Sequence, residues 1–152
     1  MASIPTRGAP SQDYMKYWRV IRYWAKAKYK VSTADIDMLF FLYSEQIFNK
    51  TKFVDFAKCM SWDDHRFYRL LDEGWVHKWR ERKGRETTLY ELSYHGKRLV
   101  NTLYNKLNGE EISESPRNNP LFKTKLSYMD KVYRDMIIEM NKFIQQQRHS
   151  AQ

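Results

Sequence analysis

The sequence has one cysteine, Cys59, and no long hydrophobic run. A single cysteine excludes an internal disulfide bond and any zinc site built from cysteines, and it suggests a reducing compartment. Cys59 has no nearby histidine that would activate it as a nucleophile, so we expect a small, buried hydrophobic residue. No apolar stretch approaches the roughly 20 residues that cross a bilayer, and the N-terminus lacks the apolar segment of about 7–15 residues that marks a secretory signal. We therefore expect a cytoplasmic protein with no membrane partner.

Signatures of catalysis are also missing. The four histidines, at positions 65, 77, 95 and 149, show no metal-ligand spacing. The sequence contains no glycine-rich loop that could cradle a phosphate group. We therefore expect no enzymatic activity, no metal and no cofactor.

Positive charge is abundant, with a net value of +9 over 152 residues. Residues 1–30 carry seven Lys or Arg and one acid, and residues 75–109 carry eight against three. Residues 31–74 carry five basic and eight acidic side chains, and residues 110–152 carry seven and six. Two basic blocks therefore flank an acidic one, which favours a polyanionic partner over the alternative that excess lysine only keeps the protein in solution.

The first half of the chain has the periodicity of helices. Residues 1–12 are rich in proline and small residues and are predicted to form a disordered tail. Apolar residues recur at spacings of three and four over 13–30, then after a cap at Ser32 or Thr33, and again over 52–58. A fourth helix starts near Ser61, which is followed three residues later by an acid, as in a capping box; this helix stops at a glycine, residue 74.

The period then changes from helical to alternating. Residues 75–80 and 87–92 alternate apolar and polar side chains around a charged loop with one glycine, which predicts a β-hairpin. Ser93 can cap a fifth helix that continues to Leu107. This order, mainly α with a small β-hairpin, is typical of a winged helix-turn-helix domain, here predicted over 13–108 with its N-terminal helix. In such a domain the fourth helix can enter the DNA major groove while the hairpin, or wing, reaches the neighbouring backbone or minor groove.

The last helix follows a linker and carries an apolar seam. Residues 109–122 contain two prolines and several small polar residues, which predicts a linker. Over 123–147 apolar side chains recur at spacings of three and four, before a short tail at 148–152. We interpret this helix as a dimerisation helix; the alternative is a helix packed in the core of its own chain. The seam consists of Leu126, Met129, Tyr133, Met136, Met140 and Phe143.

Eight residues around the hairpin form a pattern of spaced leucines and glycines with one arginine in the wing. They are Leu70, Gly74, Val76, Arg85, Leu89, Leu92, Ser93 and Gly96. This pattern resembles the MarR family of transcriptional regulators and, second, PadR-type regulators. The resemblance covers about 13–147 in element order, but its motifs cover only about 70–100. It implies N- and C-terminal dimerisation helices that flank the winged helix-turn-helix, and an Arg85 that contacts the minor groove.

Two positions depart from the family pattern. The family commonly has an Asp two residues before the wing arginine, where this chain has Lys83. The usual Asp–Arg bracing is therefore absent, and a more mobile wing is expected. The first turn of the fourth helix has Asp63 and Asp64 where a reader of the major groove usually presents neutral or basic groups. We interpret both acids as capping and dipole-compensating residues.

The wing is the strongest candidate for DNA contact, since four cations within six residues can reach phosphates and release counterions. These cations are Arg80, Arg82, Lys83 and Arg85. The alternative is a solvated hairpin tip.

Four side chains of the fourth helix can share one exposed face. An arginine on this face can bind a phosphate or a guanine edge, or it can pair with a nearby acid, Asp63 or Glu73. They are Trp62, His65, Arg66 and Arg69. Lys50 and Lys52 are weaker candidates for phosphate contacts.

Two further groups have a plainer interpretation. One is a row of cations on the first helix, either DNA-flanking or, as we favour, simply its solvent face: Lys16, Arg19, Arg22 and Lys26. The other is a set of aromatic residues, which we interpret as core although the resemblance would allow a pocket for a small-molecule effector: Tyr14, Tyr17, Trp18, Trp24 and Trp79.

These features together predict a transcriptional regulator that binds double-stranded DNA as a homodimer and is associated with the nucleoid when bound. Its two half-sites should lie about one helical turn apart. The acidic block at 31–74 keeps an alternative open: a winged-helix protein that does not regulate transcription. Such a protein would be an architectural DNA binder, or a protein–protein adaptor in a larger assembly such as that of a phage.

Overall fold

The computed structural model describes residues 13–60 and 65–150. The elements are α1 (Tyr14–Tyr29), α2 (Thr33–Glu45), β1 (Ile47–Phe48), α3 (Lys50–Cys59), α4 (His65–Asp72), β2 (Val76–Arg80), β3 (Leu89–Leu92), α5 (Tyr94–Leu107), the short 3-10 helix η1 (Pro120–Phe122) and α6 (Tyr128–Ser150). The predicted class, mainly helical with a small hairpin, is confirmed. The predicted tail at 1–12, the capping segment at 61–64 and the last two residues lie outside the described residues.

Contacts within the chain divide it into two compact units. Unit 2 covers residues 31–103, from α2 through most of α5, and unit 1 combines α1 with the chain from Tyr104 onward. The sequence predicted that the first helix belongs to the winged-helix domain and that the last helix is separated from that domain by a linker. In the structure α1 instead packs against α6 and η1. The boundaries between the units lie inside α5 and between α1 and α2.

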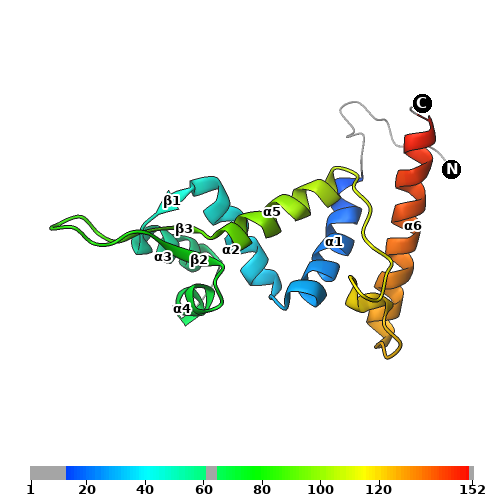
Figure 1. The fold of residues 1–152 in the computed structure, drawn as a ribbon, viewed down its shortest axis with the longest axis horizontal. Coiled ribbons are helices and arrows are strands. Elements are labelled where there is room, and N and C mark those ends of the chain that lie inside the picture. Colours follow the sequence, from blue (N-terminus) through cyan, green and yellow to red (C-terminus); the bar gives the residue numbers. More distant parts are fainter. Residues whose placement is uncertain (1–12, 61–64, 151–152) are drawn as a thin grey trace. The chain divides into compact units, whose positions relative to one another are not determined.

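Unit 2 has the topology of a winged helix. Its three-stranded antiparallel sheet has the order β1-β3-β2, so the central strand β3 joins the short β1 to the wing (Figure 1). Val76 lies opposite Leu92, and both side chains are buried beneath the helices. The core is filled by apolar side chains from each helix: Ile36, Leu39, Leu42, Phe53, Ala57, Phe67, Leu70, Leu99, Val100 and Leu103.

Side-chain caps fix where the helices of unit 2 begin. Ser32 and Asp35 form a capping box: the Asp35 N–H donates to Ser32 Oγ at 3.1 Å, and the Ser32 N–H donates to the Asp35 carboxylate at 3.0 Å. Asn49 accepts from the Lys52 N–H at 2.9 Å, so α3 begins at Lys50 rather than at residue 52 as predicted. β1 was not predicted, because a strand of two residues has no detectable period.

The joint between the wing and α5 is tightly packed. Ser93 Oγ donates to the Gly74 carbonyl at 2.5 Å and accepts from the Gly96 N–H at 3.1 Å, so it caps α5 as predicted. Gly74 has φ +82°, the left-handed region that favours glycine after a helix. A Cβ atom at Gly96 would lie only 2.5 Å from the Trp75 carbonyl oxygen. Gly74 is therefore explained by its backbone conformation and Gly96 by the lack of space for a side chain.

In unit 1, α6 buries one face and fastens the preceding loop. Its buried side chains include Ile137, Met140 and Ile144. Asn141 is also buried: its amide donates to the Ile112 carbonyl at 2.8 Å and accepts from the Ile112 N–H at 3.1 Å. The segment predicted as a linker, 109–122, is thus packed against α6, because it buries apolar side chains and its backbone polar groups find partners.

We expect Gly96→Ala to lower the free energy of unfolding by about 1–3 kcal/mol, because the added methyl group must displace the backbone at Trp75. Urea unfolding followed by circular dichroism measures the change. Arg98→Ala, at an exposed position of the same helix, is the control and should stay within about 0.5 kcal/mol of the parent protein. Equal stability of Gly96→Ala and the control would contradict the close approach.

Candidate nucleic-acid interface

The wing extends beyond the helices of unit 2 and ends in a tight turn (Figure 1). The Lys83 N–H donates to the Glu86 carbonyl at 3.2 Å, and the Glu86 N–H donates to the Lys83 carbonyl at 3.0 Å. These two bonds enclose Gly84 and Arg85. Gly84 has φ +63°, which a two-residue hairpin turn requires at its first position and which glycine adopts at little cost. The turn therefore places Arg85 at the end of the hairpin.

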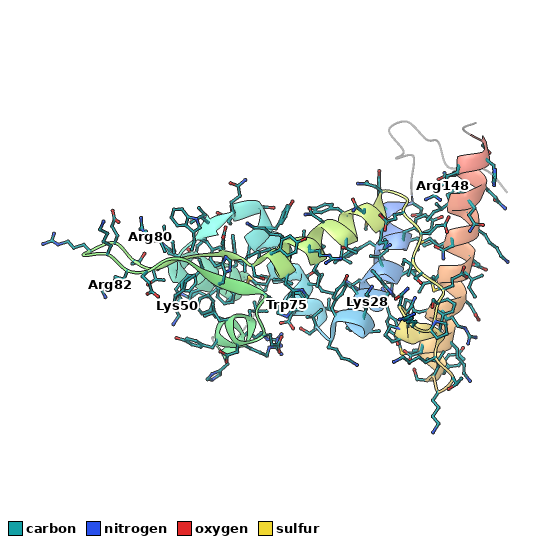
Figure 2. The ribbon with its side chains drawn as sticks, viewed as in Figure 1. Lys28, Lys50, Trp75, Arg80, Arg82 and Arg148 are labelled. Atoms are coloured by element: carbon teal, nitrogen blue, oxygen red, sulfur yellow. The ribbon has the colours of Figure 1, made fainter. Side chains whose placement is uncertain are left out.

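Three of the four predicted wing cations are exposed. Among the described residues, Lys83 and Arg85 form no ion pair, and Arg82 Nε donates only to the Gly84 carbonyl, at 3.3 Å. Arg80 is half-buried, and its Nη2 lies 3.3 Å from a Glu86 carboxylate oxygen. This ion pair connects the two sides of the hairpin. It can stabilise the wing even though Lys83 replaces the Asp of the MarR-type pattern. Figure 2 shows Arg80 and Arg82 along the hairpin.

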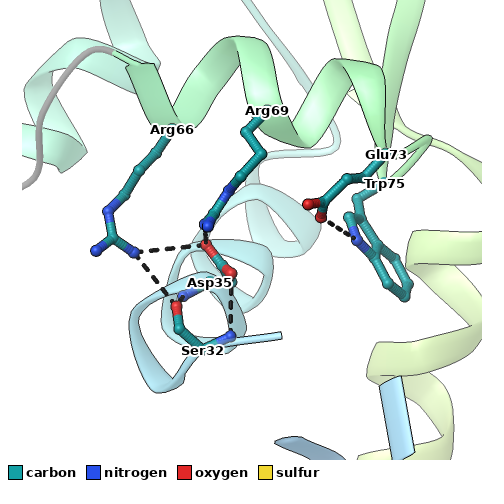
Figure 3. Close-up of polar contacts among 6 residues, drawn as sticks. All are labelled: Ser32, Asp35, Arg66, Arg69, Glu73 and Trp75. Atoms are coloured by element: carbon teal, nitrogen blue, oxygen red, sulfur yellow. Dashed lines mark hydrogen bonds and ion pairs between the residues drawn. The ribbon is translucent and has the colours of Figure 1, made fainter. Parts of the chain in front are cut away.

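The two arginines of α4 point toward α2 (Figure 3). Arg69 binds the Asp35 carboxylate, and Arg66 Nη1 lies 3.6 Å from the same carboxylate and donates to Ser32 Oγ at 3.3 Å. Only 2% of Asp35 is exposed, and a buried carboxylate is costly unless cations and hydrogen bonds compensate it. Of the acids suggested from the sequence, Glu73 instead accepts from Trp75 Nε1 at 3.2 Å, and Asp63 lies outside the described residues.

The outward face of α4 therefore presents neutral groups alongside its arginines. His65 and Tyr68 are exposed, whereas the candidate Trp62 lies outside the described residues. Tyr68 was missed in the sequence analysis, although its spacing of three from His65 places both on one helix face. Lys50 Nζ donates to the Tyr68 hydroxyl at 2.5 Å and lies 4.7 Å from the centre of its ring. This contact ties the start of α3 to α4.

A groove of about 240 Å³ lies between the start of α3 and the wing. Lys50 and Arg82 contribute cations from its two sides, and Figure 2 labels both. No acid is found among its described lining residues, which are Asn49, Lys50, Thr51, Arg82, Thr87, Thr88 and Tyr90. The hydroxyl groups of the threonines can donate hydrogen bonds to an anion. These threonines could not be recognised from the sequence, because the groove joins segments that are far apart in the chain. Lys52 is exposed, with its Nζ 5.6 Å from the Phe56 ring centre.

The predicted seam of α6 is divided between two environments. Tyr133 stacks on Tyr23 of α1 with ring centres 3.9 Å apart, and Met140 is buried. Met129 and Phe143 are exposed by 56% and 40%, and Met136 is half-buried. α6 begins at Tyr128 rather than at residue 123 as predicted, so Leu126, also half-buried, lies before the helix and is not part of its seam. Val132, 38% exposed, extends the exposed side. α1 thus covers one part of the apolar face of α6 and also reaches Phe143, whose ring centre lies 6.0 Å from that of Tyr17. The neighbouring stripe is only partly exposed, because Met136 and Phe143 line a small pocket together with Tyr17 and Val20 of α1.

The interface of α1 and α6 contains a polar contact as well. The Tyr23 hydroxyl donates to the Asp130 carboxylate at 2.7 Å, and this hydrogen bond raises the pKa of Tyr23 to about 12. Arg19 Nε donates to the Tyr133 hydroxyl at 3.3 Å. Arg19, Lys16 and Lys26 are exposed and Arg22 is half-buried, which fits a solvent face and a DNA-flanking face of α1 equally.

Two residues lie where the sequence analysis did not place them. The prediction that Cys59 is buried is wrong: Cys59 is exposed, because α3 turns Phe53 and Ala57 inward and Cys59 is on the other face. Trp79 is 49% exposed on β2, whereas the other members of the aromatic set lie on α1 and are buried or half-buried. Trp79 therefore is not part of the core.

Residues 13–60 and 65–150 were the basis for two further observations on the kinds of site that the chain can form. These residues contain no cluster of three or more His, Cys, Asp or Glu side chains that could hold a metal ion. None of the described helices is long and apolar enough to cross a membrane.

Comparison with protein-family models and with curated proteins finds no match. Among solved structures, the chain is similar to the crystal structure of a mutant MarR from E. coli complexed with operator DNA. The two are 14% identical with a TM-score of 0.45, over 82% of this chain and 84% of that chain. Similarity at this level says nothing about what the chain binds. The topology itself defines the class of unit 2, which is a winged helix-turn-helix domain.

We expect Arg69→Gln to lower the free energy of unfolding by about 1.5–3 kcal/mol, because the variant loses a charge-assisted hydrogen bond to the buried Asp35. Chemical denaturation measures the change. His65→Gln, at an exposed position of the same helix, serves as the control and should change stability by less than about 0.5 kcal/mol. If the two variants are equally stable, Arg69 does not hold α4 on α2.

Proposed function

We propose that this chain is a transcriptional regulator that binds double-stranded DNA as a homodimer, with its wing on the backbone or minor groove and α4 at the major groove. The observation that carries the proposal is the wing tip. Lys83 and Arg85 are exposed at the end of a projecting hairpin and form no ion pair within the described residues. Cations placed in this way can neutralise phosphates and release counterions at little cost in lost internal contacts.

The groove beside the wing supports a second phosphate contact. Lys50 and Arg82 lie on its two sides and Thr51, Thr87 and Thr88 supply hydroxyl groups. Backbone phosphates are positioned by such combinations of cations and hydroxyl donors. A duplex held by the wing tip and by this groove would be gripped at two places.

Base recognition by α4 relies less on its arginines than the sequence suggested. To contact DNA, Arg66 and Arg69 would have to leave the Asp35 carboxylate, and the hydrogen bond from the Ser32 N–H would then be the remaining described contact that compensates this buried charge. His65 and Tyr68 are the remaining described candidates on the exposed face. Weak base reading combined with a firm grip on the backbone is typical of an architectural DNA binder, which is therefore our second candidate function.

The dimer is proposed on the outward stripe of α6. Met129, Val132, Met136 and Phe143 recur at spacings of three, four and seven and so share one helix face. Three of them are exposed by 38% or more. A second copy related by a two-fold axis would cover this stripe with the same stripe of its own. Two copies would place two winged helices on two half-sites of a DNA palindrome.

Selection of bound fragments from a random pool of duplexes tests the DNA proposal. We expect the protein to enrich a palindromic motif whose half-sites are about one helical turn apart. The double variant Arg82→Ala/Arg85→Ala should bind more weakly. Its plot of log affinity against log salt concentration should be shallower by about two, since each lost phosphate contact removes about 0.9 from the slope.

Arg98→Ala is the matched control, because it removes an exposed cation of unit 2 outside the wing. Binding by the double variant that equals the binding by this control would contradict the role of the wing. Tight binding without an enriched motif would favour the architectural function over the regulator. No affinity at low salt would exclude both DNA functions and favour a protein–protein adaptor.

Charge placed on the outward stripe of α6 should dissociate the dimer. We expect Met129→Glu/Phe143→Glu to sediment as a monomer at concentrations where the parent protein is a dimer, because two carboxylates would be buried at the apolar interface. Analytical ultracentrifugation measures the change. Lys142→Glu, exposed on a different face of α6, should remain a dimer. A parent protein that is monomeric at all concentrations would contradict the dimer proposal.

A further inference from the structure

The pairing of the two wing strands is interrupted at Trp79. Lys78 lies opposite Tyr90 and Arg80 lies opposite Leu89, so Trp79 is an extra residue on β2 with no partner of its own on β3. Such a β-bulge bends the strand and changes the direction in which a side chain points. Bulges are common beside functional sites for this reason. Here the extra residue is a tryptophan, which has the largest side chain of the standard amino acids.

The bulge leaves this side chain in contact with solvent. Trp79 is 49% exposed, whereas Trp24 and Trp75 are exposed by 2% and 4%. Tryptophan has a large apolar surface and is strongly favoured in cores and interfaces. Exposing half of an indole on a hairpin that projects from the domain is therefore costly, and a bound partner would recover that cost.

The surroundings of Trp79 indicate the chemistry of the partner. The Arg80 guanidinium carbon lies 6.0 Å from the centre of the indole ring, and Glu86 holds the same guanidinium at 3.3 Å. Arg82, Lys83 and Arg85 follow in the next five positions. An aromatic ring can stack on another ring, and a row of cations can bind anions. Together they are suited to a polymer in which rings alternate with anionic groups. Nucleic acid has this composition, with a base or sugar adjacent to every phosphate.

We propose that Trp79 is a nucleic-acid contact of the wing, which places its indole against a deoxyribose or a partly unstacked base while the neighbouring cations bind phosphates. This inference rests on the proposed DNA-binding function and names a residue that the sequence analysis assigned to the core. The contact is apolar and aromatic, so it adds affinity without releasing counterions. It thereby differs from the contacts of Arg82 and Arg85 in a measurable way.

The salt dependence of binding separates the two kinds of contact. Affinity of the full chain for a labelled duplex of about two helical turns is measured by fluorescence anisotropy over a range of salt concentrations. We expect Trp79→Ala to weaken binding roughly five- to 150-fold at every salt concentration and to leave the slope unchanged. Trp79→Phe should retain part of the affinity. Tyr94→Ala, which removes an exposed aromatic residue of α5, is the matched control and should bind as the parent protein does.

A second measurement does not depend on affinity. Acrylamide quenching of the parent protein and of Trp79→Phe identifies the fluorescence of Trp79 by difference. We expect saturating duplex to protect this component from the quencher. Protection together with the uniform loss of affinity in Trp79→Ala would support the contact.

Three results would overturn the proposal while leaving the DNA-binding function intact. They are unchanged affinity of Trp79→Ala, continued quenching of Trp79 in the complex, and a loss of affinity that comes with a shallower salt slope. The last result would show that the indole acts only by positioning Arg80. Failure of the parent protein to bind the duplex would instead reject the DNA-binding function on which the inference rests.

Discussion

The arrangement of unit 2 depends on a buried carboxylate. Asp35 belongs to the capping box of α2, and it also receives Arg69 and approaches Arg66 from α4. One side chain thus stabilises the start of one helix and fixes the position of another. Both arginines remain partly exposed but are engaged with this carboxylate, whereas His65 and Tyr68 are exposed side chains of α4 that do not contact Asp35. The same ion pairs that hold the helix in place therefore limit the contacts that its arginines can make with a partner.

Local features of this fold were predictable from the sequence. Alternation over 75–80 and 87–92 identified the hairpin. Caps predicted at Ser32 or Thr33 and at Ser93 identified the starts of two helices, and the structure has them at Ser32 and Ser93. These signals depend on residues a few positions apart. The ion pair of Asp35 with Arg69 joins residues 34 positions apart, and no local pattern records it. The groove threonines were missed for the same reason. Tyr68 was predictable in principle, since the periodicity of α4 contains it.

The α6 helix shows a second limit of sequence patterns. A period of three and four identifies an apolar face but not what covers it. Here α1 covers Tyr133 and Met140 and contacts Phe143 through Tyr17, while Met129 on the adjoining stripe is exposed and Phe143 is partly so. The core-helix interpretation therefore applies to part of this surface, and the proposed dimer contact concerns only the part that is exposed. The number of acids in residues 31–74 likewise overstates the negative charge at the surface. Asp35 is buried and paired with Arg66 and Arg69, so it adds little to that charge.

The bulge at Trp79 has a consequence for how the protein behaves at high concentration. β1 and β2 are the two edges of the sheet, where unpaired backbone groups can recruit a strand from another molecule. β1 spans two residues and β2 spans five, with its regular ladder broken at the bulge. Neither edge is long and flat enough to template a growing stack of strands. The sheet is therefore a poor template for edge-to-edge aggregation.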